Sequence, residues 1–354
     1  MKSLDLVMIA RDEARCIARC LNSVRSWVNQ MWVLDTGSVD DTAAIARRCG
    51  AQVAHFVWCD DFAAARNAAL ALSQADWVLV LDADEWIDGA APALTALKTT
   101  AQDFIGQISV VSQFDAGDSI QEAPSWISRV LPRGVRYSGP VHEQPESDLP
   151  RRRLALSVMH DGYRATQMQT KQGRNRALLL QALTQDPNDA YLRYQLGKDF
   201  ELQGDYTQAE AQYALAAAPA AAGWRHDLIL RRLFSLKKLQ RHEQALALAA
   251  DEMPAWPASP DFYFTVGDVL LDWAAQEPAR GGELLPMIEN AWVKAIDIGE
   301  QPQLQDTVRG RGSFLAAHNL AVLHESLGHS EQAGHWRERE AKMRAYASMR
   351  ALHQ

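Results

Sequence analysis

Two carboxylates separated by a single residue follow the most apolar short run of the chain. In the stretch WVLVLDADE, Asp82 and Asp84 come directly after the apolar residues 77–81. Carboxylates at the end of a strand can hold a divalent cation, and such a cation can bind a diphosphate and stabilise the charge that develops on it. Oxygen ligands of this kind favour Mn²⁺ or Mg²⁺ over zinc. Because acidic residues often follow strands, this pattern taken alone is weak and favours a structural role.

Other polar residues follow the remaining strand-like runs. Asp12 lies in ARDE, Asp35 in LDTGS and Asp61 in CDDF. A carboxylate in such a place can accept hydrogen bonds from a base imide or a ribose hydroxyl, although Asp, Gly and Ser are also turn formers and Asp61 can cap a helix that starts at residue 62. Arg66 in AARNAAL can form a surface ion pair with Asp60 or Asp61.

These residues stand at the ends of alternating strand-like and helical stretches. The apolar runs are 4–10, 31–34, 52–57 and 77–81, and the helical stretches between them are 16–27, 42–49 and 62–72. This β-α order predicts a parallel sheet with right-handed crossovers, and the run at 77–81 is typical of a strand covered on both faces. Ligands bind beyond the carboxyl ends of such strands, so we expect the polar residues to meet there. Residues 105–163, with short strand-like pieces broken by Pro and Gly, predict an irregular extension of the same domain.

The second half of the chain has helical periodicity and contains a repeat. Residues 191–218 place Leu196, Gly197, Phe200, Ala209, Tyr213 and Ala216 at the spacings of a tetratricopeptide hairpin. A second copy near the C-terminus places Leu320, Gly328, Ala333 and Trp336 in the same way, while 227–250 and 262–275 match more loosely and 278–286 reads as an insertion. A single hairpin cannot bury its apolar face, so we expect three or four stacked copies. The predicted domains are 1–168 and 169–354.

The composition excludes several classes of protein. The 354 residues include 36 basic and 44 acidic side chains, a net charge of −8, which argues against nucleic acid as a partner. No run approaches the roughly 18 apolar residues that a membrane span needs, and the N-terminus becomes charged too soon for a signal peptide. The four cysteines have no CxxC spacing and predict reduced thiols in a cytoplasmic protein. Peripheral membrane contact stays open.

Taken in order, the motifs resemble those of family 2 glycosyltransferases with the GT-A fold. The resemblance is strongest to the subgroup in which tetratricopeptide-like repeats follow the catalytic domain. The matching stretches are MIARDEARCIARCLNSV, VLDTGSVDDTAAIA, FVWCDDFAAARNAALALSQADWVLVLDADEW and YSGPVHEQ. The resemblance implies an α/β fold, with a Rossmann-like GT-A nucleotide-sugar domain followed by an all-α tetratricopeptide-like repeat domain.

The resemblance also implies a role for each site residue. It places Asp35 against the nucleoside of the donor, Arg66 near its diphosphate, and Asp84 on the metal. The donor-binding set that it implies is Ala10, Asp12, Asp35, Asp61, Arg66, Asp82 and Ala83, and the metal set is Asp82, Asp84 and His160 of MHDGY. Family members commonly carry Asn where this chain has Asp12, so that contact departs from the pattern.

Glu143 in SGPVHEQ is the expected catalytic base, with Asp84 as the other catalytic residue. In an inverting transfer the base takes the acceptor proton as the acceptor attacks C1, and a nearby carboxylate stabilises the oxocarbenium-like transition state. Glu143 and His160 each have a structural alternative as hydrogen-bonded residues. Arg129 and Arg133 in SRVLPRG are candidates for balancing the diphosphate charge or holding an anionic acceptor.

The expected function is therefore an inverting, metal-dependent sugar transfer from a nucleotide-sugar, with UDP as the favoured nucleotide. The acceptor is expected between the two domains. Tetratricopeptide surfaces commonly bind peptides, which favours a peptide or protein acceptor, as in sublancin-type peptide S-glycosyltransferases. Three alternatives stay open: a lipopolysaccharide-core or other envelope-glycan transferase, a repeat scaffold with a vestigial transferase domain, and a phosphatase or nucleotidyltransferase. A nucleotidyltransferase usually has a Gly-rich loop where this chain has ARDEA. The sequence leaves the sugar, the acceptor atom and a homodimer undecided.

Overall fold

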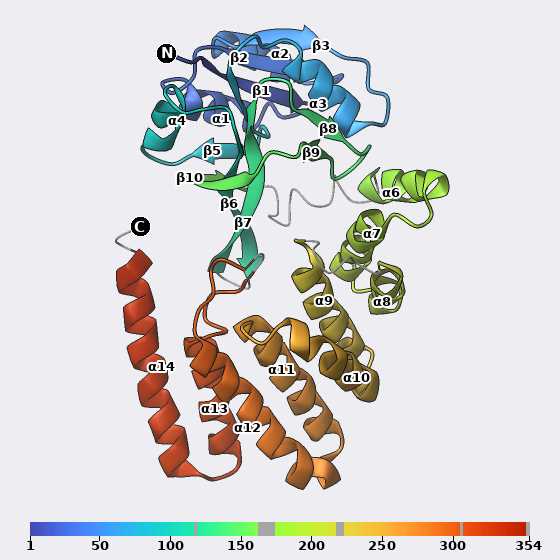
Figure 1. The fold of residues 1–354 in the computed structure, drawn as a ribbon, viewed down its shortest axis with the longest axis vertical. Coiled ribbons are helices and arrows are strands. Elements are labelled where there is room, and N and C mark those ends of the chain that lie inside the picture. Colours follow the sequence, from blue (N-terminus) through green and yellow to red (C-terminus); the bar gives the residue numbers. More distant parts are fainter. Residues whose placement is uncertain (117–118, 162–173, 217–222, 305–306, 352–354) are drawn as a thin grey trace. The chain divides into compact units, whose positions relative to one another are not determined.

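A mixed sheet of eight strands forms the centre of the first of two units, Met1–Gln185 and Asp186–Gln354. The computed structural model describes residues 1–116, 119–161, 174–216, 223–304 and 307–351 (Figure 1). The strands are β1 (Leu4–Ala10), β2 (Met31–Asp35), β3 (Gln52–His55), β4 (Trp77–Val80), β5 (Glu85–Ile87), β6 (Ile105–Ala116), β7 (Ser119–Pro132), β8 (Arg136–Ser138), β9 (Gln144–Glu146) and β10 (Arg151–His160). The helices of this unit are α1 (Ile17–Val24), α2 (Thr42–Arg48), α3 (Phe62–Leu70), α4 (Pro92–Leu97) and α6 (Arg174–Gln185).

The strand order in the sheet is β3-β2-β1-β4-β7-β6-β10-β5. The strands β3, β2, β1 and β4 pair in parallel, as the β-α alternation predicts. Strand β7 then runs antiparallel to β4 and β6, and β5 runs antiparallel to β10 at the far edge. Strands β8 and β9 form a separate antiparallel pair. The carboxyl ends of β1, β2, β3 and β4 therefore lie at one edge, where the acidic motifs follow them.

The side chains of β4 explain why this apolar run forms a central strand. Trp77 and Leu79 pack on one face of the sheet in a core that includes Ile17 and Leu21 of α1. Val78 and Val80 pack on the opposite face in a second core that includes Ala63 of α3. Since successive side chains of a strand alternate between faces, only a strand covered on both sides can be apolar at every position. The two-sided burial predicted for this run is confirmed.

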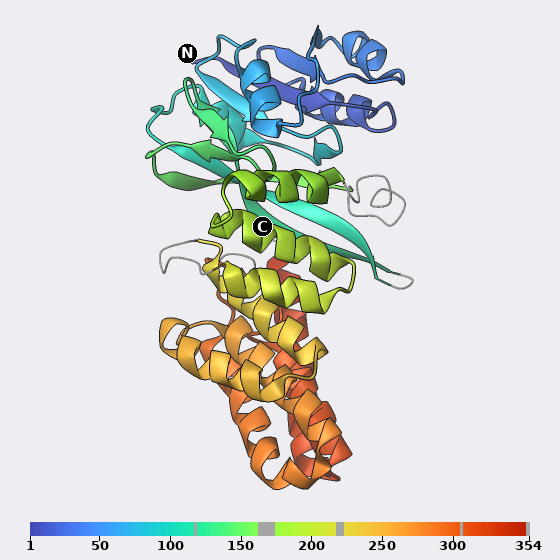
Figure 2. The ribbon, with the colours of Figure 1, turned by 90° about the vertical axis from the view of Figure 1, so that its right-hand side faces the viewer.

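Strands β6 and β7 form one long hairpin, where the sequence predicted short, broken pieces (Figure 2). Gly106 and Pro132, which were expected from the sequence to break the strands, lie at positions where they do not interrupt the pairing. Gly106 lies where a Cβ atom would collide with Leu154 and Val130, so the absent side chain lets the neighbouring strands approach. Pro132 stands at the last residue of β7, where the missing N–H disturbs the ladder least.

Helices make up the whole regular structure of the described part of the second unit. They are α7 (Ala190–Leu202), α8 (Tyr206–Leu215), α9 (Arg225–Lys238), α10 (His242–Glu252), α11 (Pro260–Gln276), α12 (Gly281–Ile298), α13 (Phe314–Ser326) and α14 (Ser330–Ala351), with short 3₁₀ turns η1 (Met253–Ala255) and η2 (Pro278–Arg280). Figure 2 shows these helices stacked pair upon pair. The predicted α/β half followed by an all-α half is confirmed.

Two of the helical pairs are closed by the same contact between a glycine and a large ring. A Cβ atom on Gly197 of α7 would collide with the ring of Tyr213 in α8. In the same way, a Cβ atom on Gly267 of α11 would collide with the indole of Trp292 in α12. Both rings are fully buried. The residues 278–286 are therefore not an insertion, because they form η2 and the first turns of α12, the partner helix of α11.

The division into two units falls after Gln185, which groups α6 with the sheet. The domain boundary predicted at 168/169 lies within residues 162–173, outside the described residues, and it stays a prediction.

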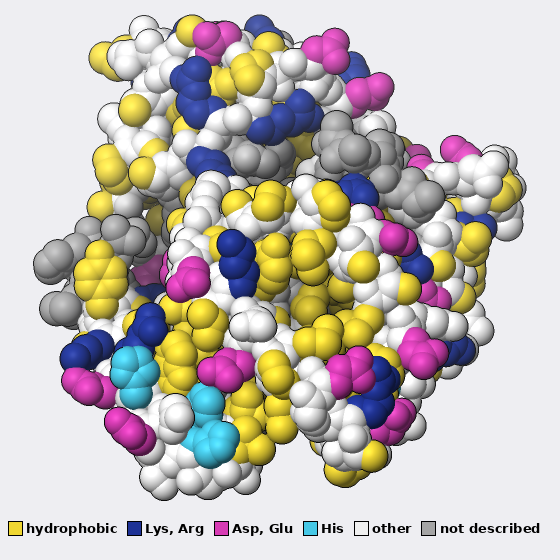
Figure 3. Space-filling view, turned by 60° about the horizontal axis from the view of Figure 1, so that its bottom comes forward, with side chains coloured by type: hydrophobic (Ala, Val, Ile, Leu, Met, Phe, Trp, Pro, Cys, Tyr) yellow, Lys and Arg dark blue, Asp and Glu magenta, His cyan; other side chains and the backbone are white. Residues whose placement is uncertain are grey.

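Within the described ranges, no helix is both long enough and apolar enough to cross a membrane. Figure 3 shows hydrophobic side chains gathered on one face, and the exposed large apolar residues of the helical unit include Leu271, Met287 and Val322.

Candidate functional site

The carboxyl ends of the first three parallel strands place Ala10, Asp35 and His55 in one row. Ala10 of β1 is paired with Asp35 of β2, and Asp35 is paired with His55 of β3. Asp35 is buried, and its Oδ2 accepts hydrogen bonds from the backbone N–H groups of Gly37 and Ser38 at 3.3 and 3.2 Å. Its Oδ1 is buried without a hydrogen-bond partner among the described residues. A buried acceptor of this kind marks a place where a ligand donor or an ordered water binds.

Asp12 joins the loop after β1 to the loop after β2. Its Oδ1 accepts a hydrogen bond from the Val39 N–H at 2.8 Å, and its own N–H donates to Ser38 Oγ at 3.0 Å. The backbone of Asp12 is in the left-handed region, with φ 55°, which Asn and Asp tolerate better than most residues. The carboxylate therefore holds the loop after β1 to the loop after β2. Its predicted donor contact stays a prediction.

Arg66 of α3 joins Asp82 to Glu143. Its Nη2 donates to Asp82 Oδ1 at 2.6 Å, and its Nε donates to Glu143 Oε1 at 2.9 Å. The guanidinium is buried, so both ion pairs act in a medium that screens them weakly. The structure thus brings together three predicted site residues that lie far apart in sequence, and it replaces the surface ion pair with Asp60 or Asp61 that the sequence left open.

Arg129 of β7 also belongs to this cluster. From the sequence it was a candidate for balancing the diphosphate charge or holding an anionic acceptor. Its Nη2 donates to Asp82 Oδ2 and to Glu85 Oε1, both at 2.7 Å, and its side chain is buried. Glu85 in turn accepts a hydrogen bond from the Asp82 N–H at 2.9 Å. Arg129 therefore neutralises the acidic motif from within the protein. Arg133, the other candidate, instead donates to Gln74 at the surface.

The charges of this cluster shift its pKa values in opposite directions. Burial opposes ionisation of Asp82, but the guanidinium groups of Arg129 and Arg66 outweigh it and hold the pKa of Asp82 well below its usual range. For Glu85, burial outweighs the attraction of Arg129 and raises the pKa. Arg66 Nη1, Arg129 Nε and Tyr137 Oη are buried here without hydrogen-bond partners among the described residues. The cluster therefore has spare donors for an anion or a water.

Helix α3 is fixed so that Arg66 points into this cluster. Asp61 caps the helix, with its Oδ1 accepting from the Ala64 N–H at 2.8 Å, which is the structural alternative that the sequence left open for it. Asn67 then forms two hydrogen bonds with the backbone of Tyr137, at 2.8 and 2.9 Å. Asn67 was missed by sequence reasoning as a positioning residue, although it stands in the ARN motif next to Arg66.

Asp84 and His160 form a close pair beside the arginine cluster. The carboxylate Oδ2 lies 3.5 Å from Nε2 of His160, because His160 of β10 is paired with Glu85 of β5, the next residue along from Asp84. Nδ1 of His160 lies 3.1 Å from Ser112 Oγ, which fixes the ring. Burial disfavours the charged imidazolium, but the hydrogen bond to Asp84 outweighs it and raises the pKa of His160.

These residues fit a divalent cation as a pair rather than as a set of three. Among the described residues, no group of three or more His, Cys, Asp or Glu side chains is arranged around one point. Both carboxylate oxygens of Asp82 are bonded to arginines. Mg²⁺ commonly takes one or two carboxylates and completes its shell with substrate phosphates and water. Asp84 and His160 are therefore the two side chains that would hold such a cation, and Ala83, between the two acidic residues in sequence, is buried.

Two arginines of the α1 region lie next to this pair. Arg15 forms two hydrogen bonds to the Asp161 carboxylate, at 3.0 and 3.2 Å, and Arg19 forms a third at 2.7 Å. The Arg19 guanidinium also lies 3.6 Å from the centre of the Trp86 ring. Burial opposes ionisation of Asp161, but the two arginines outweigh it and lower the pKa. Asp161 thus ties the end of β10 to the start of α1.

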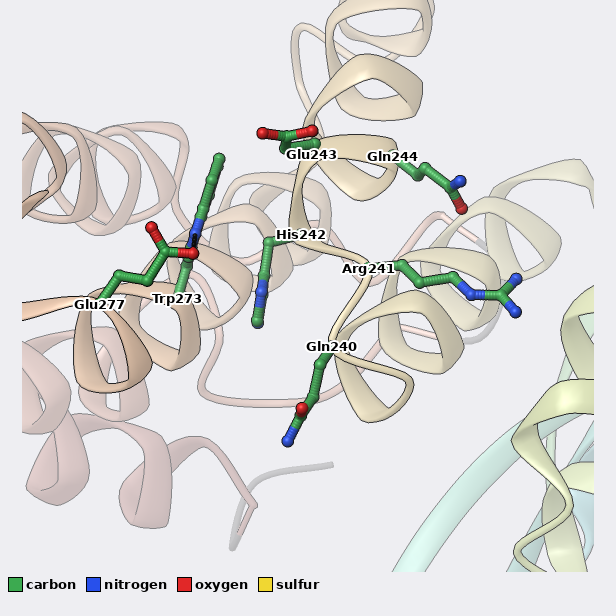
Figure 4. Close-up of a pocket in the computed structure, with 7 residues that line it drawn as sticks. All are labelled: Gln240, Arg241, His242, Glu243, Gln244, Trp273 and Glu277. Atoms are coloured by element: carbon green, nitrogen blue, oxygen red, sulfur yellow. Dashed lines mark hydrogen bonds between the residues drawn. The ribbon is translucent and has the colours of Figure 1, made fainter.

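The helical unit contains a small pocket of its own at the start of α10 (Figure 4). His242 and Trp273 face each other there as stacked rings, with centroids 5.6 Å apart. Nε2 of His242 lies 2.8 Å from Asp272 Oδ2, and the Trp273 N–H donates to Glu277 Oε1 at 3.0 Å. His242 Nε2 and the Trp273 N–H are therefore already engaged, and the stack joins α10 to α11.

The sequence profile of glycosyl transferase family 2 matches residues 5–137. This stretch carries β1 to β7 together with Asp35, Arg66, Asp82 and Asp84. Residues 5–137 therefore form a glycosyl transferase family 2 domain. The family domain covers every strand of the eight-stranded sheet except β10, and the helical unit follows, so the GT-A assignment made from the motifs is confirmed.

Two curated relatives extend the likeness beyond the family domain. The chain is 34% identical over 272 residues to the TPR repeat-containing protein Synpcc7942_0270 of Synechococcus elongatus, which covers 72% of this chain and 66% of that protein. It is 27% identical over 210 residues to the SPbeta prophage-derived glycosyltransferase SunS of Bacillus subtilis, which covers 55% of this chain and 48% of that protein. The chain therefore spans between about half and two thirds of the length of these relatives.

Among solved structures, MamA aligns with 52% of this chain and 97% of its own, at 14% identity and a TM-score of 0.39. A TM-score this low does not support a fold assignment. The assignment rests on the strand order and on the family match.

Proposed function

We propose that the chain transfers a sugar from a nucleotide-linked donor to an acceptor, with UDP as the nucleotide and with inversion at the transferred carbon. The observation that carries this proposal is the contact of Arg66 with both Asp82 and Glu143. The buried guanidinium of Arg66 thereby joins the end of β4, where a donor diphosphate is expected, to Glu143, the residue that we assign as the base. The Asp84–His160 pair lies at the same edge of the sheet.

In the proposed reaction, an acceptor atom forms a bond to C1 of the sugar while the bond from C1 to the diphosphate oxygen breaks. Glu143 accepts the acceptor proton, and the nucleoside diphosphate leaves with the bonding electrons. Arg66 holds the Glu143 carboxylate in place through its Nε. Asp35 receives a hydrogen-bond donor of the nucleoside. A Mn²⁺ or Mg²⁺ ion held by Asp84 and His160, when bound, supplies positive charge to the diphosphate.

We further propose that the acceptor is a peptide or protein. Stacked helical pairs form extended surfaces that commonly bind polypeptide segments, and the helical unit has exposed apolar side chains such as Leu271 and Val322. The relation to SunS, a glycosyltransferase, supports the same chemistry on a similar chain. We place the activity in the cytoplasm, because all four cysteines are free thiols in the structure.

The test is to incubate the protein with a set of UDP-sugars and Mn²⁺ in a lysate and to analyse the peptide and lipid fractions by mass spectrometry. The proposal predicts a mass increase of one sugar on peptides, and none when Asp84→Asn replaces the wild type. Sugar found only on lipid or glycan would replace the peptide acceptor by an envelope glycan. Binding of UDP without transfer to any fraction would favour a scaffold with an inactive transferase domain.

A further inference from the structure

His55 lies beside Asp35, the proposed nucleoside contact, but has no role in the proposed reaction. It is the last residue of β3, and the register of the sheet puts it directly beside Asp35 of β2. Nδ1 of His55 lies 3.3 Å from Asp35 Oδ2, and Nε2 lies 3.1 Å from Nη2 of Arg47 in α2. Both ring nitrogens of His55 are therefore engaged, one by a carboxylate and one by a guanidinium.

These two partners select one tautomer of the neutral ring. An arginine side chain has only donors, so Nε2 of His55 must accept the hydrogen bond from Arg47 through its lone pair. The proton of the neutral ring then sits on Nδ1, from which it is donated to Asp35 Oδ2. With the backbone donors of Gly37 and Ser38, this bond holds the Asp35 carboxylate in one orientation from three sides.

The ring itself is open to solvent while its partner is not. The side chain of His55 is 64% exposed, whereas that of Asp35 is 5% exposed. An aromatic ring that is fixed at its edge by two hydrogen bonds and bare over most of its surface presents a flat face that costs little to order. Such faces are where nucleobases stack in proteins, and His is one of the side chains that serve as platforms.

We propose that His55 binds the nucleobase of the donor, with its ring as a stacking platform and its Nδ1–H as the group that orients Asp35. This inference rests on the proposed function, because it takes Asp35 as the nucleoside contact. It adds a residue of β3 to the donor site and assigns Arg47 as the positioning residue that holds the ring. A nucleobase that lies on His55 offers its edge to Asp35, the neighbour of His55 in the row.

The two roles can be separated by three substitutions at one exposed position. His55→Phe keeps an aromatic face and removes the hydrogen bond to Asp35. His55→Asn keeps a donor near the position of Nδ1 and removes the face, and His55→Ala removes both. The matched control is Gln52→Ala, an exposed residue at the other end of the same strand. Binding of UDP and of inorganic pyrophosphate, each with Mn²⁺, is measured by calorimetry.

We expect His55→Ala to weaken UDP binding roughly tenfold, the size of one lost stacking contact, and to leave pyrophosphate binding unchanged. His55→Phe and His55→Asn should fall between wild type and His55→Ala, and Gln52→Ala should match wild type. Unchanged UDP binding by His55→Ala would overturn the inference, as would an equal loss of UDP and pyrophosphate binding. A wild-type protein that binds no nucleoside diphosphate at all would instead overturn the proposed function itself.

Discussion

Nε of Arg66 lies 2.9 Å from Oε1 of Glu143, and both side chains are nearly enclosed by protein. This bond gives Glu143 a fixed position and leaves its second carboxylate oxygen to meet an acceptor. A variant that tests Glu143 must therefore keep an oxygen atom that accepts the hydrogen bond from Arg66.

Glu143→Gln should abolish transfer while it preserves the fold. The amide oxygen can accept the hydrogen bond from Arg66, but the amide cannot take a proton, so we expect kcat to fall between about 100-fold and 10,000-fold. UDP binding should stay within about twofold of wild type, well below the tenfold change that corresponds to about 1.4 kcal/mol. Initial rates with UDP-sugar and calorimetry with UDP check this. Glu146→Gln, an exposed carboxylate on β9, is the control, and full activity in Glu143→Gln would remove Glu143 as the base.

Asp84→Asn should weaken the binding of Mn²⁺ in the presence of UDP. The substitution replaces a charged ligand by a neutral amide next to His160, and we expect a loss of more than about tenfold, since even changes to outer-shell partners cost that much. Calorimetric titration of Mn²⁺ into the UDP-saturated protein measures it. Asp88→Asn alters an exposed carboxylate of the same segment and should leave the affinity unchanged. Equal Mn²⁺ binding by both variants would rule out Asp84 as a ligand.

Arg129→Met should destabilise the protein strongly. The substitution leaves the buried Glu85 carboxylate without its guanidinium partner, and removal of one partner of a buried ion pair costs about 3–5 kcal/mol. The free energy of unfolding from urea titration is the measurement. Arg133→Met, only four residues along but exposed, should change it by less than about 0.5 kcal/mol. A small effect of Arg129→Met would mean that water or a neighbouring cation compensates the carboxylates.

Gly267→Ala should destabilise the helical unit, although alanine is the better helix former. Its Cβ atom would collide with the buried indole of Trp292, and overpacking of this kind costs about 1–3 kcal/mol. Gly197→Ala should behave alike through Tyr213. Gly334→Ala in α14, where a Cβ atom meets nothing within 4 Å, should instead stabilise by about 0.5–1 kcal/mol. Thermal unfolding of the three variants tests the contrast, which an equal response of all three would contradict.

Asp227 should make the stability of the helical unit sensitive to acid. Burial opposes its ionisation, but Arg231 and Lys198 outweigh it and lower its pKa, so the folded state binds a proton less readily than the unfolded state. Its stabilising contribution is therefore complete above about pH 4 and is lost as the pH falls below that value. Asp227→Asn should destabilise the protein more at pH 7 than at pH 3. The exposed Asp251→Asn is the control, and a pH-independent effect of Asp227→Asn would refute the assignment.

Local patterns were enough to locate the strands and helices around the nucleotide edge. The run at 4–10 is a strand with the same bounds in the structure, and the helix expected from residue 62 begins there. These signals are local, because apolar alternation and capping residues act within a few residues of one another. Asp35 and Asp82 were found for the same reason, since each stands at the end of a strand, whereas Arg66, in the middle of α3, was supplied by the resemblance.

The contacts made by later strands could not be predicted in this way. Arg129 reaches Asp82 because β7 inserts between β4 and β6, and no pattern within the sequence of β7 specifies its neighbours. His55 was missed because its place beside Asp35 depends on the register of β3 against β2. The resemblance supplied Glu143 and His160, whereas the structure supplied their partners, Arg66 for Glu143 and Asp84 for His160.

The glycine–ring contacts of the helical pairs have a consequence for how such chains change over evolutionary time. Tyr213 is buried against the glycine of its own pair, and Trp292 against the glycine of its own pair. Each of the two pairs thus has an internal contact of its own, although α9 to α14 also share one hydrophobic core. Because this contact recurs within a pair, the helical pair is the natural unit by which such a stack lengthens or shortens, while the residues of the sheet stay unaltered.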